Sequence, residues 1–154
     1  MRLAKTFIIR ARDRLSTRDA RATARLELTD DGFVLLQEGQ SEPCMSLNWS
    51  DIRSIRTYKF DAFSYDVICL AFQVAENPWL EICEDDQGFD AVRQEMERRF
   101  PDIPRTWLWD VAVPAFAPNH TVLYPFDQEQ YSRQLAERQA AARAVKPDLL
   151  SRWD

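Results

Sequence analysis

Three consecutive carboxylates, Glu84, Asp85 and Asp86, stand shortly before a glycine in the segment EICEDDQGFDAVRQEMERRF. A calcium loop would place glycine at its sixth position and Glu at its twelfth. Counted from Asp85, Gly88 is fourth, so that spacing does not fit. The run precedes a helical pattern, where Asp85 or Asp86 can cap the helix and the negative charge favours its N-terminus. An acidic interaction surface formed by Glu84, Asp85 and Asp86 stays open as an alternative, with metal binding the least favoured.

Other residue types with catalytic potential are sparse. His120 is the single histidine and lies between Asn119 and Thr121, with no nucleophile motif beside it. A zinc site of the usual kind needs paired ligands such as CxxC, whereas the three cysteines are isolated along the chain: Cys44, Cys69 and Cys83. Only three glycines are present, too few for the glycine-rich loops that cradle phosphates. We therefore predict no catalytic residues, no metal and no cofactor, and we interpret the cysteines as buried apolar groups.

The elements that must position these residues begin with β-strands. Residues 3–11 and 22–29 alternate in polarity, and the second run would bury one face: Ala22, Ala24, Leu26 and Leu28. The turn signal at 30–32 then leads into a returning strand at 33–38. A short turn around Trp49 precedes a strand over about 53–60, and residues 120–126 suit a final short strand.

Two further strands, 67–74 and 79–84, form a predicted hairpin. If Leu70 and Phe72 share the core face with Leu80 and Ile82, the pairing register is restricted to a few values. One of these registers places Cys69 opposite Cys83, on the face away from the main core.

Helices are predicted after each of the last two strands. From Asp86 an apolar stripe runs through Phe89, Val92, Met96 and Phe100, which is one helical face. The aromatic and proline-containing segment 101–126 follows, and within it residues 107–119 are predicted to be extended and docked on the core. Asp127 then caps a second helix over 128–145, whose thin apolar stripe indicates a surface helix or one that completes its burial against another chain. Homo-oligomerisation through residues 127–146 is therefore one expectation.

Charge is distributed unevenly along the chain. Residues 1–25 carry eight basic and two acidic side chains, a net charge of +6, and because the whole chain has −5, the remainder carries −11. The basic segment either pairs with the acidic part of the same domain or forms a basic binding face for phosphates or an acidic partner. The residues of this candidate basic surface are Arg10, Arg12, Arg14, Arg18 and Arg21.

The chain length of 154 residues indicates one domain over 1–154, large enough to bury a core. No apolar run is long enough to span a membrane. The N-terminal apolar stretch is too short for a signal peptide, so we expect a cytoplasmic protein.

A hairpin ending in DDGF, a Trp49–Asp51–Ile52 step into a strand, and a WLEI hairpin leading to an amphipathic helix resemble small bacterial domains of the pleckstrin-homology-like class. The resemblance covers roughly residues 20–100. It implies an α+β fold in which a curved antiparallel sheet or partly open barrel is closed by one helix. Here a C-terminal helix is added. The resemblance implies no lipid site, because the basic loop residues that bind phosphoinositides have no counterpart in this chain.

These observations favour a non-catalytic protein-interaction domain with an unidentified protein partner. A variant of this hypothesis is an immunity protein or inhibitor, whose acidic body would neutralise a basic toxin. A hydrolase that uses His120 with carboxylates is a second hypothesis. Binding of phospholipid or nucleic acid through the N-terminal arginines is a third, and the acidic composition argues against nucleic acid.

Overall fold

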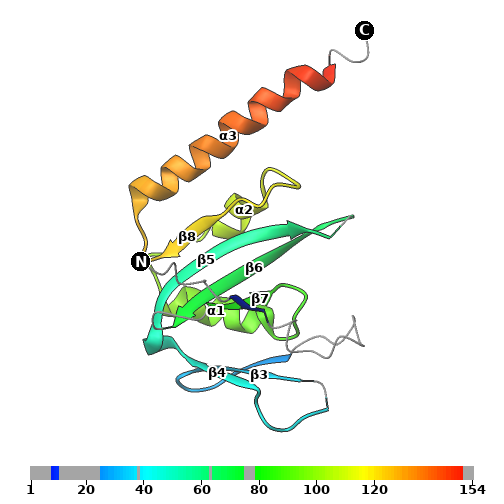
Figure 1. The fold of residues 1–154 in the computed structure, drawn as a ribbon. Helices are drawn as coiled ribbons and strands as arrows, with labels where there is room; N and C mark the ends of the chain where they lie inside the picture. The colour runs from blue at the N-terminus through cyan, green and yellow to red at the C-terminus, as the bar shows by residue number, and fades with distance from the viewer. Residues whose placement is uncertain (1–7, 11–24, 38, 63, 75–78, 151–154) are drawn as a thin grey trace, which may run out of the picture.

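The computed structural model describes residues 8–10, 25–37, 39–62, 64–74 and 79–150, which form two β-sheets and three α-helices (Figure 1). The larger sheet has the order β1-β7-β6-β5-β8 and the smaller one the order β2-β3-β4. All neighbouring strands are antiparallel except β1, which runs parallel to β7. The sheets do not close into a barrel. The predicted α+β class with antiparallel sheets and a C-terminal helix is therefore confirmed, in an open arrangement.

The bounds of the elements follow the chain in order. The larger sheet contains β1 (Ile8–Arg10), β5 (Ile52–Asp61), β6 (Asp66–Val74), β7 (Trp79–Cys83) and β8 (Thr121–Tyr124). The smaller sheet contains β2 (Arg25–Leu28), β3 (Gly32–Leu36) and β4 (Met45–Asn48), and a 3-10 turn, Trp49–Asp51, joins the two sheets. The helices are α1 (Phe89–Arg99), α2 (Trp107–Ala112) and α3 (Gln128–Leu150).

The main core lies between the two sheets and α1. Phe33 of the small sheet, Phe72 of the large sheet and Trp49 of the connecting turn meet there, with ring centroids 5.4 to 6.4 Å apart. Phe89, Val92 and Met96 of α1 are buried against them, as the apolar stripe predicts. Leu28 departs from the predicted face of β2, because its side chain is exposed whereas that of Leu26 is buried.

Gly88 fixes the junction between β7 and α1. Its φ of +88° lies in the left-handed region, and a Cβ there would come within 2.1 Å of the carbonyl oxygen of Leu26. The Leu26 amide donates a hydrogen bond to the carbonyl of Gln87, which holds β2 against this turn. The helix begins at Phe89 rather than Asp86, with Gly88 as its N-cap and no side-chain cap. The predicted cap by Asp85 or Asp86 is therefore wrong, because the backbone at Gly88 makes the turn.

The segment 107–119 also differs from its prediction. Residues 107–112 form α2, because Trp107 and Val111 are one helical turn apart and both enter the core. The Trp107 indole N–H donates to Glu97 of α1 at 2.9 Å, so a polar contact supports the docking. Prolines at 114 and 118 indicated an extended chain, but they lie beyond the helix and do not interrupt it.

The last helix begins as the sequence predicts and extends further. The Asp127 carboxylate accepts a hydrogen bond from the Gln130 amide at 2.8 Å, which confirms the cap. The first turns of α3 lie on the body, where Tyr131 is buried. The C-terminal half of α3 points away from both sheets (Figure 1).

Candidate functional site

The two faces of the large sheet carry different side chains. Leu70 pairs with Ile82 and Phe72 with Leu80 on the main-core face, which confirms the predicted hairpin register. Cys69 consequently lies opposite Cys83 on the other face, also as predicted. Tyr58 of β5 lies opposite Cys69 in the next strand, and Glu81 precedes Cys83 by two positions on the same face. Three strands thus bring Tyr58, Cys69, Glu81 and Cys83 together.

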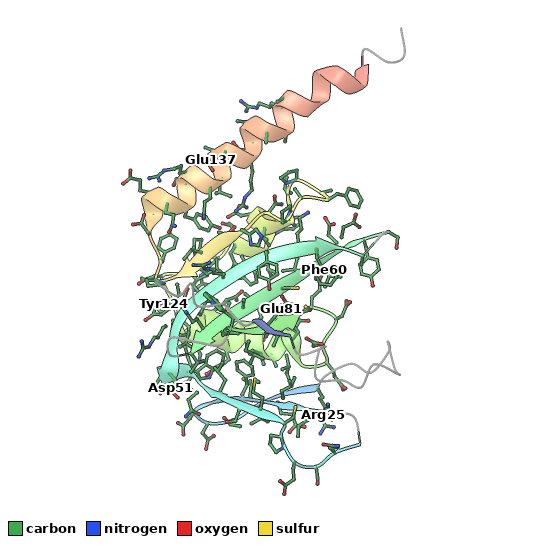
Figure 2. All side chains as sticks on the ribbon, viewed as in Figure 1. Arg25, Asp51, Phe60, Glu81, Tyr124 and Glu137 are labelled. Atoms are coloured by element: carbon green, nitrogen blue, oxygen red, sulfur yellow. The ribbon has the colours of Figure 1, made fainter. Side chains whose placement is uncertain are left out.

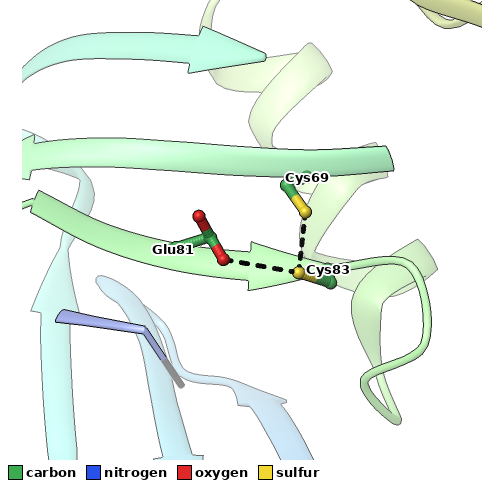
Figure 3. Close-up of side chains that lie close together, drawn as sticks. All are labelled: Cys69, Glu81 and Cys83. Carbon is green, nitrogen blue, oxygen red and sulfur yellow. Dashed lines mark hydrogen bonds between the residues drawn. The ribbon is translucent and has the colours of Figure 1, made fainter. Parts of the chain in front are cut away.

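The donor atoms of this thiol–carboxylate cluster (Cys69, Glu81 and Cys83) converge. The two sulfurs are 2.8 Å apart, and Cys83 Sγ is 3.8 Å from Glu81 Oε1 (Figure 3). Neither cysteine is in a disulfide. The exposed fractions are 0% for Cys69, 2% for Cys83 and 4% for Glu81. One donor atom from each of the three residues lies within 4.8 Å of the others.

Tyr58 holds the carboxylate from its far side. Its hydroxyl donates a hydrogen bond to Glu81 Oε2, whereas Oε1 is the oxygen near Cys83. Burial, followed by the hydrogen bond and the charge of Glu81, raises the pKa of Tyr58 far above its usual value. The phenol therefore remains a proton donor at neutral pH and fixes the orientation of the carboxylate.

Two thiols and a carboxylate in one buried cluster have a limited chemistry. The sulfurs can be oxidised to a disulfide, or as thiolates they can bind a soft metal ion. Sequence motifs missed this cluster because its cysteines are 14 positions apart and belong to different strands. The hairpin register was the one signal that could find it, since it pairs the cysteines and places Glu81 on their face.

The acidic run does not act as one surface. Glu84 and Asp85 are exposed, whereas Asp86 is buried. The Asp86 carboxylate accepts a hydrogen bond from the Cys83 amide at 2.8 Å, and its own amide donates to the Cys83 carbonyl at 2.9 Å. Asp86 therefore stabilises the turn that ends β7, and only Glu84 and Asp85 face solvent.

His120 is exposed, and its ring lies 5.0 Å from that of Tyr58. Within the described part of the chain its ring makes no hydrogen bond to a carboxylate. Glu137 of α3 (Figure 2) and His120 line one shallow groove. Of the candidate basic surface, the residues from Arg12 to Arg21 lie outside the described residues, as does the side chain of Arg10. The backbone of Arg10 pairs with Glu81 where β1 joins β7.

A second candidate site is the apolar groove between α2 with its following loop and α3. Its volume is about 310 Å³, and its lining is mostly apolar: Trp109, Val113, Pro114, Leu135 and Ala142, beside the polar residues Asp110, Arg138 and Gln139. Trp109 and Val113 are 76% and 64% exposed, although Trp107 and Val111 of the same helix are buried. The helix thus presents one apolar face to the core and another to solvent.

Buried polar contacts fix both walls of the apolar groove. Lys59 Nζ donates to the carbonyls of Ala112 and Pro114 at 3.0 and 2.6 Å and pairs with Asp66 at 2.5 Å. Asp66 also accepts the Phe116 amide, and the hydrogen bonds from Lys59 and this amide hold the pKa of Asp66 below its usual value. The loop is therefore tied down while the side chains of Val113 and Phe116 point outward.

The other wall of the groove, α3, is held through Asp110 of α2. The Tyr131 hydroxyl donates to the Asp110 carboxylate at 2.5 Å, and Arg138 donates to the Asp110 carbonyl at 2.8 Å. Burial, followed by the hydrogen bond to Asp110, raises the pKa of Tyr131 well above its usual value. The first half of α3 is thereby locked beside α2, and the groove has a defined shape.

Comparison with known proteins gave no matching family model, no matching curated protein and no matching solved structure. The pleckstrin-homology-like resemblance therefore stays a prediction. Among the described residues, no helix has the length and apolar character needed to cross a membrane.

Proposed function

We propose that this chain is a non-catalytic, cytoplasmic protein-interaction protein that binds a second copy of itself through the apolar groove. The observation that carries the proposal is the exposure of Trp109 and Val113 beside α3. Three of the five exposed large hydrophobic side chains in the described part of the chain come from this short region: Trp109, Val113 and Phe116.

An exposed apolar surface is unfavourable in water unless a binding partner covers it. Contiguous exposed apolar side chains mark interaction sites on soluble proteins, and tryptophan is enriched among the residues that dominate binding energy. The buried face of α2 already anchors the helix through Trp107 and Val111, so the core does not require Trp109. The ion pair between Lys59 and Asp66 also keeps the groove pre-formed, which lowers the entropy lost on binding.

The apolar stripe of α3 argues for a second copy as the occupant. Tyr131, Leu135 and Ala142 face the body at helical spacing, and the same spacing continues in the sequence to Val145 and Leu149. These last positions fall in the half of α3 that points away from the sheets (Figure 1). An antiparallel second copy would bring the protruding half of its α3 to the groove of its neighbour, which gives a two-fold, self-complementary contact.

The test is the mass of the purified full chain in solution, measured by light scattering over a concentration series. Wild type is expected to dimerise, and Ala142→Arg is expected to be monomeric because the long side chain would occupy the groove. Ala140→Arg is the matched control, since Ala140 is exposed on the opposite side of the same helix, and it should remain dimeric. Trp109→Ser should weaken the dimer at least about tenfold, as loss of an interface tryptophan commonly does.

A wild-type protein that stays monomeric at every concentration would overturn the proposal. So would equal behaviour of Ala142→Arg and Ala140→Arg. A monomer that instead binds a different purified protein through Trp109 would retain the groove as a binding site but reject the second copy as its occupant.

A further inference from the structure

The thiol–carboxylate cluster carries an inference that is independent of the apolar groove. We propose that Cys69, Cys83 and Glu81 form a binding site for a single Zn²⁺ ion inside the large sheet. Three strands build the site: Cys69 comes from β6, Glu81 and Cys83 come from β7, and Tyr58 of β5 supports the carboxylate. The remaining thiol, Cys44, belongs to another part of the molecule and donates to the carbonyl of Leu35.

The first argument is the convergence of the donor atoms. Cys69 and Cys83 occupy directly opposed positions, and the neighbouring pair, Ile68 and Glu84, is joined by a hydrogen bond from the Glu84 amide to the Ile68 carbonyl. Hydrogen-bonded and non-hydrogen-bonded pairs alternate in antiparallel sheets, so the cysteines occupy the closer type. Their side chains therefore meet without any change in the backbone.

The second argument compares the distances between donor atoms with those around a tetrahedral ion. Zinc–sulfur bonds of about 2.3 Å place two ligating sulfurs about 3.8 Å apart in tetrahedral geometry. The sulfurs are 2.8 Å apart and the nearer carboxylate oxygen is 3.8 Å from Cys83 Sγ. The two sulfurs would therefore have to separate by about 1 Å, through rotation about the Cα–Cβ bonds of the cysteines, to bind the ion.

The third argument is the support of the carboxylate. Carboxylates that bind metal ions are usually held by a further hydrogen bond, which fixes their orientation. Tyr58 donates this bond to Oε2, and Oε1 remains on the side of the sulfurs.

The mixture of donors selects the metal. Calcium and magnesium require oxygen ligands alone, and copper(I) prefers sulfur without a carboxylate, whereas zinc accepts both sulfur and oxygen. Binding would release the two thiol protons to solvent as the sulfurs become ligands. Three protein ligands leave one position of a tetrahedral ion for water or another small ligand.

The experiment uses Co²⁺ as a spectroscopic probe for the zinc site. The full-length protein is treated with a chelator under anaerobic reducing conditions, titrated with Co²⁺, and then titrated with Zn²⁺. One equivalent of Co²⁺ should give thiolate-to-cobalt charge-transfer absorption and the visible bands of a tetrahedral ion, and Zn²⁺ should abolish both. Wild type should also unfold at a higher temperature with Zn²⁺ than without it.

Three variants and one control assign the ligands. Cys69→Ser and Cys83→Ser should lose the charge-transfer bands, and Glu81→Gln should keep some sulfur absorption while losing affinity. Cys44→Ser is the matched control and should bind like wild type. Tyr58→Phe keeps every ligand and should weaken binding about 10–100-fold, as loss of an outer hydrogen bond commonly does.

Several results would overturn the zinc site. They are the absence of thiolate–cobalt bands in wild type, bands that persist in Cys69→Ser, and bands that vanish in Cys44→Ser. A Cys69–Cys83 disulfide whose reduced form takes up no metal would also reject it and assign the pair to thiol oxidation. If the serine variants fail to fold by circular dichroism, the comparison of wild type with Tyr58→Phe decides, because both proteins keep the two thiols.

Discussion

The two faces of β6 and β7 arise from alternate residues of the same strands, yet they are stabilised in different ways. The main-core face presents Leu70, Phe72, Leu80 and Ile82 to the small sheet and α1. The opposite face buries Cys69, Glu81 and Cys83 as completely, although one of the three is a carboxylate. The main-core face is stabilised by burial of apolar area alone, whereas the opposite face requires hydrogen-bond partners placed in the right direction for its carboxylate.

The apolar face therefore contributes to folding, whereas the face with the thiols and the carboxylate offers reactive groups. Apolar side chains tolerate exchange when their volume is conserved, because the hydrophobic effect has no direction. A buried carboxylate is tolerated only when hydrogen bonds compensate the loss of water. Glu81 therefore depends on partners such as the Tyr58 hydroxyl, whereas a leucine in the main core needs no hydrogen bond.

The largest effect is expected on the main-core face. Phe72 is fully buried and contacts the rings of Phe33 and Trp49. Phe72→Ala should lower the free energy of unfolding by about 3–5 kcal/mol, because it leaves a cavity where the two sheets meet. Urea denaturation measures this loss. Phe116→Ala is the control, since Phe116 is exposed, and a similar cost for both variants would contradict the assignment of the core.

A smaller effect is expected on the opposite face. Tyr58→Phe removes the hydroxyl that donates to Glu81 and should cost about 1.5–3 kcal/mol, the usual range for a hydrogen bond to a charged group. Because folding raises the pKa of Tyr58, the wild-type advantage is present at neutral pH and is lost above about pH 10, where the unfolded phenol ionises.

Urea denaturation at pH 7 and at high pH measures both parts of the Tyr58 prediction. Glu81→Gln combined with Tyr58→Phe should cost less than the sum of the single changes, because the two residues share one contact. Strict additivity of the two changes would show that the hydrogen bond carries no net stability. The opposite face would then be held by packing alone, and the contrast between the two faces would disappear.

Local patterns predicted the parts of the fold that depend on neighbouring residues. The β2–β3 hairpin follows from its Asp-Asp-Gly turn, the β6–β7 register from its alternation, and the start of α3 from the Asp127 cap. Each of these signals lies within a few positions of the structure that it specifies. The register also placed the two cysteines together, although it could not show that a tyrosine from a third strand supports the carboxylate.

The features that escaped prediction depend on distant contacts. The parallel pairing of β1 with β7 joins segments about 70 positions apart, and no local pattern specifies it. Lys59 alternates correctly for a strand, but its burial depends on the carbonyls of Ala112 and Pro114, which only the folded loop supplies. The apolar groove was not predicted for the same reason, because its two walls, α2 and α3, meet only in the tertiary structure.

The smallest effect is expected where the two faces end together, at the turn after Cys83. Asp86→Ala removes the carboxylate that accepts the Cys83 amide and should cost about 1–2 kcal/mol. Asp102→Ala is the control and should change stability by less than about 0.5 kcal/mol, because Asp102 is exposed. Replacing Glu84, Asp85 and Asp86 together should cost more than Asp86→Ala alone in urea denaturation, because Glu84 also accepts a hydrogen bond from the Ile68 amide at 2.9 Å. A triple variant as stable as Asp86→Ala would mean that the hydrogen bond from the Ile68 amide to Glu84 adds no net stability.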